Sequence, residues 1–152
     1  REHLRDPARR GATDDIDGHR LGLRHVAAIA HEQLRELHAR RLIADIGRRI
    51  HVLIAEVDGQ AVGYAIYFFS YASFRARPKL YLEDLFVLPE HRRGGLGAKF
   101  FAELRKVARR GGCARIEWIV LDWNKPARRF YAKLGAKPLA GWSVYWLDPG
   151  RR

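Results

Sequence analysis

The stretch from Leu80 to Arg110 constrains the fold most, because an apolar run passes through a glycine-rich turn directly into an amphipathic run. Residues 80–88, LYLEDLFVL, are apolar at most positions, which is typical of a β-strand near the centre of a sheet. After Gly95 the apolar residues recur at helical spacing, and Gly111 with Gly112 predicts the end of that helix. A strand joined by a short turn to a helix indicates a layered α/β protein.

Two strands are predicted before this stretch. Residues 49–57 and 61–71 are rich in β-branched and aromatic side chains. Asp58 and Gly59 join them, and this dipeptide suits a tight turn. The two runs therefore predict an antiparallel hairpin.

Two more strands and a short helix are predicted after it. Residues 114–121 and 142–147 have the composition of strands. Between them, Asn124 and Pro126 supply an N-cap and a first-turn residue for a short helix. Because a helix connects the strand at 80–88 to the strand at 114–121, these two strands are expected to run parallel.

The length sets the number of domains. A chain of 152 residues with 47% apolar composition suffices for one compact core, so we expect a single domain over residues 21–152. Residues 1–20 are polar and lack a hydrophobic period, which predicts a poorly ordered N-terminal tail. Residues 23–37 have apolar side chains at helical spacing and predict a helix.

The composition also bounds location and chemistry. No stretch reaches the roughly 20 consecutive apolar residues of a membrane span, and no apolar signal-peptide core follows the N-terminus, so a cytoplasmic protein without membrane contact is expected. The single cysteine, Cys113, cannot form an internal disulfide, and no His/Cys cluster has the spacing of metal ligands. Neither a disulfide nor a metal cofactor is expected.

The positive charge is concentrated in one part of the chain. The formal net charge is +12, and the segment from Arg92 to Lys137 holds thirteen Lys or Arg residues against three acids, a net of +10. An anionic partner is expected, such as a phosphorylated ligand, an acidic surface or a nucleic acid. Nucleic-acid binding would need aromatic side chains interleaved with the charges, whereas Phe100, Phe130 and Tyr131 fall at core or cleft positions, so no nucleic acid is expected.

The turn before the long helix predicts a site for phosphate. A glycine-rich turn exposes unpaired backbone N–H groups at the positive end of the helix dipole. The sequence GGLG lacks the G-x-G-x-x-G spacing of a dinucleotide fingerprint, and no G-K-[ST] follows as in a P-loop. From the glycines alone, an ordinary tight turn with solubilising arginines is an equally good interpretation.

The wider sequence resembles one enzyme family. Arg92-x-x-Gly95-x-Gly97 resembles the [RQ]-x-x-G-x-[GA] motif of the GNAT acetyltransferases, and the blocks YLEDLFVLPEHRRGGLG, LDWNKPARRFYAKLGA and GWSVY resemble the diamine (spermidine/spermine) and thialysine N-acetyltransferases. The resemblance implies the GNAT fold, a mixed and mostly antiparallel sheet with a parallel, splayed strand pair at its centre and flanking helices. It further implies acetyl-CoA as cosubstrate, a small lysine-like or polyamine-like primary amine as substrate, and a homodimer.

Two side chains are the candidates for proton transfer. An alkylammonium is protonated at neutral pH, so a base must take its proton before the amine attacks the thioester. Glu83, placed mid-strand among apolar neighbours, would be partly desolvated and suits that role, which the resemblance also assigns to it. The resemblance makes Tyr131 the general acid that protonates the leaving thiolate. Without the resemblance, a structural acid and a packing aromatic are the commoner interpretations of these two residues.

The resemblance also implies the binding residues. The pyrophosphate of acetyl-CoA would lie on the turn, the pantetheine arm would pair with the preceding strand, and a backbone N–H near its end could stabilise the oxyanion. Asn124 would cap the short helix, contact the coenzyme, or do both. The expected cofactor-binding residues are Phe86, Val87, Arg92, Arg93, Gly94, Gly95, Leu96, Gly97 and Asn124. The expected substrate-binding residues are Glu83, Asp84 and Phe74.

The acceptor is where the sequence departs from the polyamine enzymes that it resembles. Arg75, Arg77 and Lys79 stand where those enzymes have an acidic residue near an aromatic, and Ala140 stands where they have a glutamate. These changes disfavour a polycation and favour a mono-amine that carries a carboxylate, such as a lysine analogue. Alternatives of the same fold are a protein lysine or N-terminal acetyltransferase and an inactive CoA-binding domain. A basic nucleic-acid-binding module is the alternative from another class.

Overall fold

The computed structural model describes residues 2–5 and 36–150. The chain divides into two compact units, Arg1–Ile119 and Val120–Arg152. The first unit contains the sheet that the described residues form, and the second contains α4 (Lys125–Lys133). The predicted mixed α/β class is confirmed.

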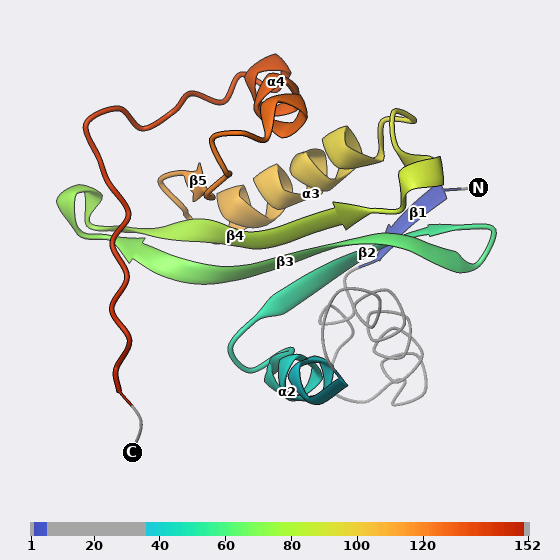
Figure 1. The fold of residues 1–152 in the computed structure, drawn as a ribbon, viewed down its shortest axis with the longest axis horizontal. Helices are drawn as coiled ribbons and strands as arrows, with labels where there is room; N and C mark the ends of the chain where they lie inside the picture. The colour runs from blue at the N-terminus through green and yellow to red at the C-terminus, as the bar shows by residue number, and fades with distance from the viewer. Residues whose placement is uncertain (1, 6–35, 151–152) are drawn as a thin grey trace. The chain divides into compact units, whose positions relative to one another are not determined.

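The first unit is built on a five-stranded sheet (Figure 1). Its order follows the chain: β1 (Glu2–Arg5), β2 (His51–Val57), β3 (Gln60–Ala72), β4 (Arg77–Val87) and β5 (Ile116–Glu117). The neighbours from β1 to β4 are antiparallel, and β4 and β5 are parallel. The parallel pair is confirmed, and it arises because α3 (Leu96–Arg110) returns the chain to the end of the sheet where β4 begins.

β2 and β3 form the predicted hairpin. Asp58 and Gly59 have φ angles of 50° and 79°, so both central residues of the turn are left-handed. A two-residue turn of this kind matches the twist of the strands that it joins, and aspartate and glycine tolerate the conformation best. The dipeptide therefore sets the register of the hairpin.

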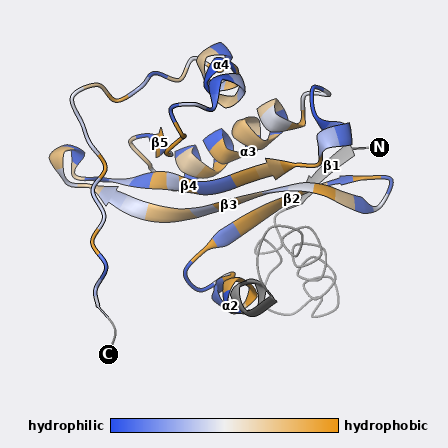
Figure 2. Cartoon of the chain, viewed as in Figure 1, coloured by the Kyte–Doolittle hydropathy of each residue, from blue (hydrophilic) through white to orange (hydrophobic). Residues whose placement is uncertain are grey.

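The two faces of the sheet carry separate apolar layers. α2 (Glu36–Asp45) lies on one face and α3 on the other (Figure 1). Apolar residues make up much of β2 and of the end of β4 that leads into α3 (Figure 2). The cluster beside α2 consists of Ile46, Val52, Ile54, Tyr64 and Ile66. The buried residues of α3 are Leu96, Phe100, Phe101, Leu104, Val107 and Ala108.

β3, β4 and α3 approach one another closely at Gly63. A Cβ atom at this position would lie 2.7 Å from the carbonyl oxygen of Phe86 and 3.3 Å from Cε2 of Phe100. Only glycine fits between the strand and the helix without displacing one of them. Gly63 therefore lets the last residues of β4, and the turn that follows them, sit close to α3.

The C-terminal strands differ from the sequence predictions. β5 spans two residues instead of 114–121, and residues 142–147, predicted as the final strand, form no strand. A β-rich sequence becomes a strand only where a neighbouring strand accepts its hydrogen bonds, and no described strand pairs with residues 142–147. The parallel pair consequently lies at the edge of the described sheet, not at its centre.

The N-terminal predictions are corrected in one place and lie largely outside the described residues elsewhere. Glu2–Arg5, inside the predicted tail, forms β1, because the free edge of β2 offers backbone partners to a sequence with no strand pattern of its own. Residues 6–20 and most of the helix predicted over 23–37 fall outside the described ranges. The single domain over residues 21–152 stays a prediction. Among the described helices, none has the length and apolar character to cross a membrane.

Candidate active site

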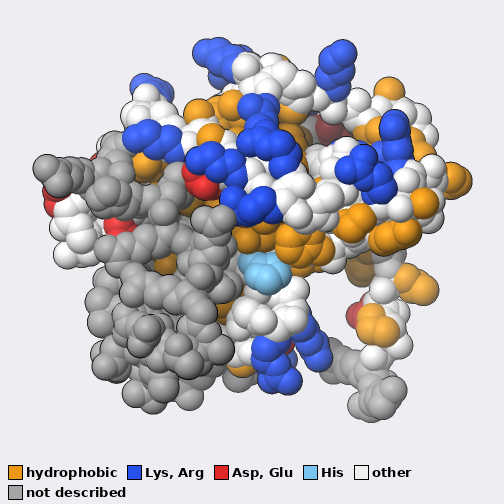
Figure 3. All heavy atoms as spheres, turned by 180° about the vertical axis from the view of Figure 1, so that it is seen from behind, with side chains coloured by type: hydrophobic (Ala, Val, Ile, Leu, Met, Phe, Trp, Pro, Cys, Tyr) orange, Lys and Arg blue, Asp and Glu red, His pale blue; other side chains and the backbone are white. Residues whose placement is uncertain are grey.

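Basic side chains extend from the junction of β4 and α3 along the exposed side of α3. Figure 3 shows Lys and Arg side chains gathered on one face of the molecule. Lys106 is paired with Glu103, with 2.6 Å between Nζ and Oε1. An excess of one sign of charge raises the local concentration of ligands of the other sign. The exposed basic residues of the turn and of α3 are Arg92, Arg93, Lys99, Arg105, Lys106, Arg109 and Arg110.

The turn between β4 and α3 contains two left-handed residues. A short 3-10 helix, η3 (Pro89–His91), follows β4, and Arg93 and Gly95 then have φ angles of 67° and 88°. Left-handed φ is costly for arginine, and such strained residues concentrate at functional sites. A turn that changes hand between neighbouring residues directs successive N–H groups to one side, where they can bind an anion.

Gly95 is the N-cap of α3 and is open to solvent. The first intrahelical hydrogen bond runs from the Lys99 N–H to the Gly95 carbonyl, 3.1 Å. The N–H groups before Lys99 have no intrahelical partner, and glycine has no side chain to cap them. A Cβ at Gly95 would meet no heavy atom within 4 Å. This end of α3 therefore presents backbone donors and a positive helix dipole to open space.

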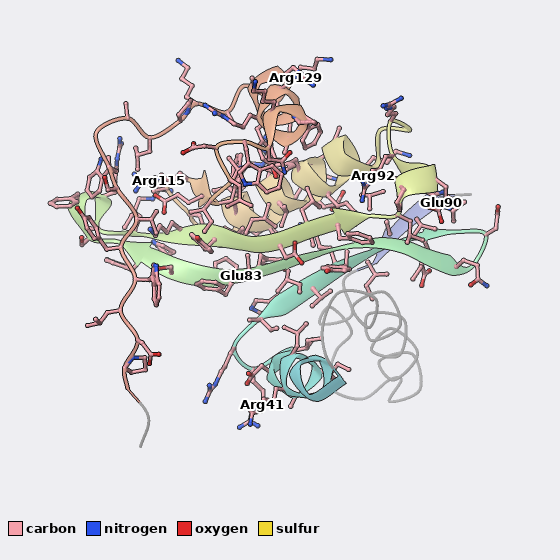
Figure 4. All side chains as sticks on the ribbon, in the orientation of Figure 1. Arg41, Glu83, Glu90, Arg92, Arg115 and Arg129 are labelled. Atoms are coloured by element: carbon pink, nitrogen blue, oxygen red, sulfur yellow. The ribbon has the colours of Figure 1, made fainter. Side chains whose placement is uncertain are left out.

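Leu96 and Arg92 hold the turn in place by different contacts. The Leu96 side chain is buried, so only its backbone is exposed for a ligand. Nε of Arg92 donates to the Val87 carbonyl, 2.7 Å, and the guanidinium lies over the Phe86 ring, 5.7 Å from its centroid. Figure 4 labels Arg92 on the turn between β4 and α3. Arg92 therefore anchors the turn to the end of β4.

β4 contains a bulge at Glu83. The register passes from Ile66 opposite Asp84 to Tyr67 opposite Leu82, which leaves Glu83 without a partner in β3. A bulge interrupts the alternation of side chains and redirects them locally, and bulges are frequent beside active sites. The Glu83 side chain is exposed, so the partial desolvation expected from its apolar neighbours in the sequence is not present.

Asp84 is held by a hydrogen bond from the core. The Tyr64 hydroxyl donates to Oδ2 of Asp84 at 2.8 Å. Tyr64 is 3% exposed, whereas Asp84 is an exposed residue. The two acids of the sequence LEDL are therefore both accessible, and one of them has a fixed orientation. Exposed carboxylates can bind an ammonium group.

The connection between β3 and β4 carries the predicted substrate residue Phe74. It forms a short 3-10 helix, η2 (Ser73–Arg75), and the Phe74 side chain is 93% exposed. Arg75 is exposed on the same turn. Arg77 is committed to a structural contact, because its guanidinium donates to the Gly112 carbonyl at 3.0 and 3.1 Å.

Lys79 belongs to a charge cluster that joins β4 to β5. Its ammonium is paired with Glu117, and Glu117 is also bound by Arg115, which Figure 4 labels. Burial acts to raise the pKa of Glu117, but the hydrogen bonds from Lys79 and Arg115 outweigh it, and the pKa lies below its usual value. The cluster keeps a net charge of +1, so the positive charge of Lys79 is partly compensated.

The second unit contains the remaining two predicted residues. Asn124 caps α4, because its Oδ1 accepts from the Ala127 N–H at 3.2 Å, and the predicted cap is confirmed. Arg128 donates to the Asp122 carbonyl, 3.0 Å, just before the helix. Tyr131 lies on α4 with its ring beside that of Phe130, 5.4 Å between centroids. The roles of Asn124 toward the coenzyme and of Tyr131 as an acid stay predictions.

A metal centre is not suggested by the part of the chain that the structure describes. Within residues 2–5 and 36–150, no group of three or more His, Cys, Asp or Glu side chains could hold a metal ion. The described groups of the site can bind an anion through N–H donors and a cation through carboxylates.

Two features of the site were missed from the sequence. The bulge had a signal, because strict alternation along LYLEDLFV would put Asp84 on the same face as the buried Leu80 and Leu82. Two successive acids in an apolar strand thus indicate an irregularity at that point. The partner of Asp84 had no local signal, because Tyr64 is twenty residues away and meets it only through strand pairing.

The family comparison covers most of the chain. Residues 20–136 match the family described as Acetyltransferase (GNAT) family. The Thialysine N-epsilon-acetyltransferase of Bos taurus is 40% identical over 109 residues, which cover 64% of this chain and 64% of that protein. The L-ornithine N5-acetyltransferase NATA1 of Arabidopsis thaliana is 38% identical over 87 residues, 57% of this chain and 38% of that protein. The matches thus span less than two thirds of the length of these relatives.

Solved structures of low sequence identity share the fold. The structure of AAC(6')-Iy in complex with the bisubstrate analogue CoA-S-monomethyl-acetylneamine has a TM-score of 0.77 and 18% identity, and the match covers 97% of this chain and 99% of that one. The ribosomal-protein-alanine N-acetyltransferase from Brucella melitensis has a TM-score of 0.72 and 18% identity, with 97% and 98% covered. At such identities the likeness establishes the fold alone.

Proposed function

Because the chain belongs to the acetyltransferase (GNAT) family, we propose that it transfers the acetyl group of acetyl-CoA to the primary amine of a small molecule. The observation that carries this proposal is the turn at Gly95, where a left-handed residue opens the N-terminus of α3 to a ligand. Backbone donors, a helix dipole and a local excess of positive charge suit the pyrophosphate of the coenzyme.

The coenzyme would lie along the end of β4 and the turn. The N–H groups from Arg93 to Gly97 bind the phosphate oxygens, and the side chains of Arg92 and Arg93 add positive charge. β5 ends at Glu117, so no described strand pairs with the outer edge of β4 from Leu82 onward. That edge is free to pair with the amide groups of the pantetheine arm.

The reaction would proceed by direct attack of the amine on the thioester. The substrate ammonium gives a proton to Glu83, directly or through water, and the neutral amine then forms a bond to the thioester carbon. A backbone N–H at Phe86 or Val87 stabilises the oxygen that becomes negative. Collapse of the tetrahedral intermediate breaks the carbon–sulfur bond, and Tyr131 donates a proton to the departing thiolate. The second proton of the attacking nitrogen is released through water and restores the Tyr131 hydroxyl, while the proton taken by Glu83 leaves to solvent.

The acceptor would be an amine that also carries a carboxylate. The relatives named for thialysine and ornithine act on amino acids of this kind, as their names state. Glu83 and Asp84 provide negative charge for one ammonium group. Arg75 and the net positive cluster at Lys79 disfavour a second ammonium and tolerate a carboxylate. Phe74 would flank the aliphatic part of the substrate.

A thiol-release assay tests the function. The protein is given acetyl-CoA with lysine analogues, ornithine, polyamines, amino acids or lysine-containing peptides, and free CoA is measured. We expect small amino-acid amines to release CoA fastest. Faster release with peptides would indicate a protein acetyltransferase of the same fold. No release with any amine would contradict the proposed function.

We also propose that the protein is a homodimer. Residues 142–147 expose large apolar side chains, including Trp142 at 67% and Leu147 at 92%. An exposed apolar segment of this kind is typical of a protein interface. Light scattering at micromolar concentration is expected to give twice the mass of the chain, and a monomeric mass would contradict the dimer.

A further inference from the structure

Tyr64 has a buried hydroxyl that is bonded to an exposed carboxylate. Its side chain is 3% exposed, and its hydroxyl donates to Oδ2 of Asp84 at 2.8 Å. A buried tyrosine hydroxyl needs a partner, and the backbone or another buried group can supply it. Here the partner is a surface acid next to Glu83, at the place where the substrate ammonium is expected. The hydrogen bond thus links the core to the proposed acceptor site.

The Tyr64 ring is fixed by its neighbours. It belongs to the apolar cluster with Ile54 and Ile66, and it stacks on the Phe86 ring with 5.7 Å between centroids. Tyr64 and Phe86 are directly opposite each other in the sheet, so the strand pairing itself sets this contact. A ring held on several sides cannot swing to follow a mobile partner. Its hydroxyl is therefore a donor at a fixed position, and the hydrogen bond to it orients the Asp84 carboxylate.

The bulge at Glu83 is what brings Asp84 to the Tyr64 side of the sheet. Asp84 is opposite Ile66, which packs in the same cluster as Tyr64. Without the extra residue, the period of two would place Asp84 on the side of Leu82 instead. The hydrogen bond therefore depends on the bulge, and the two features together display two neighbouring acids.

The hydroxyl acts as a donor throughout the working range of pH. Burial and the neighbouring Asp84 carboxylate raise the pKa of Tyr64 further above its usual value. The proton stays on the tyrosine, and Asp84 accepts the hydrogen bond. An ionised carboxylate has about four acceptor positions, so one hydrogen bond leaves acceptor capacity for an ammonium.

We propose that Tyr64 is a positioning residue for the acceptor amine: it holds the Asp84 carboxylate in one orientation beside Glu83, so that the pair binds the substrate ammonium. The inference rests on the proposed function and deepens it, because it names a residue outside the acetyltransferase motif blocks that controls affinity for the amine. A purely structural role for the hydroxyl would affect stability without a selective effect on the amine.

The test is a double-mutant cycle on the full chain. Tyr64→Phe removes the hydroxyl and keeps the ring, and Asp84→Asn keeps the shape and removes the charge. Steady-state kinetics with the best amine are expected to show a KM for the amine about tenfold higher in either variant, and a KM for acetyl-CoA within about twofold of wild type. In the Asp84→Asn background, Tyr64→Phe is expected to add less than about twofold, because the residues act as a unit.

Tyr67→Phe is the matched control. Tyr67 is a buried tyrosine of the same strand, 2% exposed, and its ring stacks on His51 instead of Phe86. Removal of its hydroxyl is expected to leave the KM for the amine unchanged. Thermal midpoints of all variants show which changes come from lower stability.

Three results would overturn the inference. These are an unchanged KM for the amine in Tyr64→Phe, equal changes in the KM values for amine and acetyl-CoA, and additive effects of Tyr64→Phe and Asp84→Asn. If Tyr64→Phe does not fold, Asp84→Asn alone decides, and a wild-type KM for the amine in that variant overturns the inference. If the wild-type protein acetylates no amine, the proposed function fails and the inference fails with it. Activity in wild type with no effect of either variant removes the inference alone.

Discussion

At the end of β4 that leads into α3, the groups offered for binding are backbone N–H donors, whereas in the middle of the same strand they are the carboxylates of Glu83 and Asp84. The first region is positive through the helix dipole and the arginines, and the second is negative through side chains. One strand thus presents opposite charges along its length. This arrangement suits a reaction that joins an anionic coenzyme to a cationic amine.

The two regions also differ in what holds them in shape. The turn depends on backbone conformation, with left-handed residues at Arg93 and Gly95, and on the buried anchor Leu96. The acidic region depends on a bulge and on a hydrogen bond from Tyr64 across the sheet. Replacing a single side chain should therefore weaken amine binding at the acidic region. Coenzyme binding at the turn should be weakened most by changes that alter its backbone conformation or its charge.

The largest expected effect comes from a negative charge placed in the turn between β4 and α3, where acetyl-CoA is proposed to bind. Gly95→Asp is expected to weaken acetyl-CoA binding by about 100-fold or more, because a carboxylate would occupy the space meant for phosphate oxygens. A Cβ at Gly95 meets no heavy atom within 4 Å, and aspartate is among the residues least strained at a left-handed φ, so the fold should survive with some loss of stability, which thermal unfolding of the variant measures. Isothermal titration calorimetry measures the affinity.

Gly95→Asn is the matched control for charge. Asparagine has nearly the same shape and the same tolerance of left-handed φ, but it is neutral. We expect it to weaken binding by about tenfold, clearly less than Gly95→Asp. Wild-type affinity in Gly95→Asp would mean that the coenzyme phosphates lie elsewhere.

The next largest effect is expected at Tyr131, the proposed general acid. Tyr131→Phe is expected to lower kcat by about 100-fold and to leave acetyl-CoA affinity nearly unchanged, because one hydroxyl is lost and the ring remains. Tyr145→Phe is the control, since Tyr145 is 90% exposed in the same unit and lies in the segment proposed for the dimer interface, outside the proposed reaction scheme. A wild-type kcat in Tyr131→Phe would return Tyr131 to a packing role beside Phe130.

The same comparison shows which parts of the site a sequence can predict. The turn was predictable because its signal is local: glycines, arginines and the start of an apolar period lie within one short stretch. α4 and its cap were predictable for the same reason, since Asn124 and Pro126 act on the adjacent backbone. Both features depend on residues that are adjacent in the sequence.

The acidic region and the ends of the sheet were less predictable, because their causes are not local. The exposure of Glu83 follows from a bulge that exists only when β3 pairs with β4. β1 formed from a polar sequence because β2 had a free edge, and residues 142–147 formed no strand in spite of a β-rich sequence. Pairing overrides intrinsic preference at such positions.

The role proposed for the acidic region is tested by comparing two amine acceptors. A lysine-like mono-amine with a carboxylate is expected to have a kcat/KM about tenfold above that of spermidine, because a second ammonium near Arg75 costs about 1 kcal/mol or more per close contact of like charges. Arg75→Glu should narrow this ratio, since Arg75 is exposed and is not part of the paired cluster at Lys79. The ratio comes from initial rates at equal amine concentration. Preference for spermidine would show that further acids, such as Asp14, Asp15 or Asp17 outside the described residues, complete a polycation site.

The smallest expected effect comes from a change at Arg92, which tests whether the turn and the acidic region act independently. Arg92 lies over Phe86, Phe86 stacks on Tyr64, and Tyr64 binds Asp84, so a continuous set of contacts joins the turn to the acidic region. Arg92→Lys keeps the charge but loses the hydrogen bond from Nε to Val87 and the planar contact with Phe86.

For Arg92→Lys we expect an acetyl-CoA affinity about three- to tenfold weaker and a KM for the amine within about twofold of wild type, because the cation–ring contact and the hydrogen bond that hold the turn are together worth about 1 kcal/mol at an exposed site. Calorimetry and steady-state kinetics on the same preparation measure the two quantities. A KM for the amine that rises in proportion to the loss of coenzyme affinity would show that the turn and the carboxylates form one coupled unit. The rings of Phe86 and Tyr64 would then transmit the change, since they are the packed groups between Arg92 and Asp84.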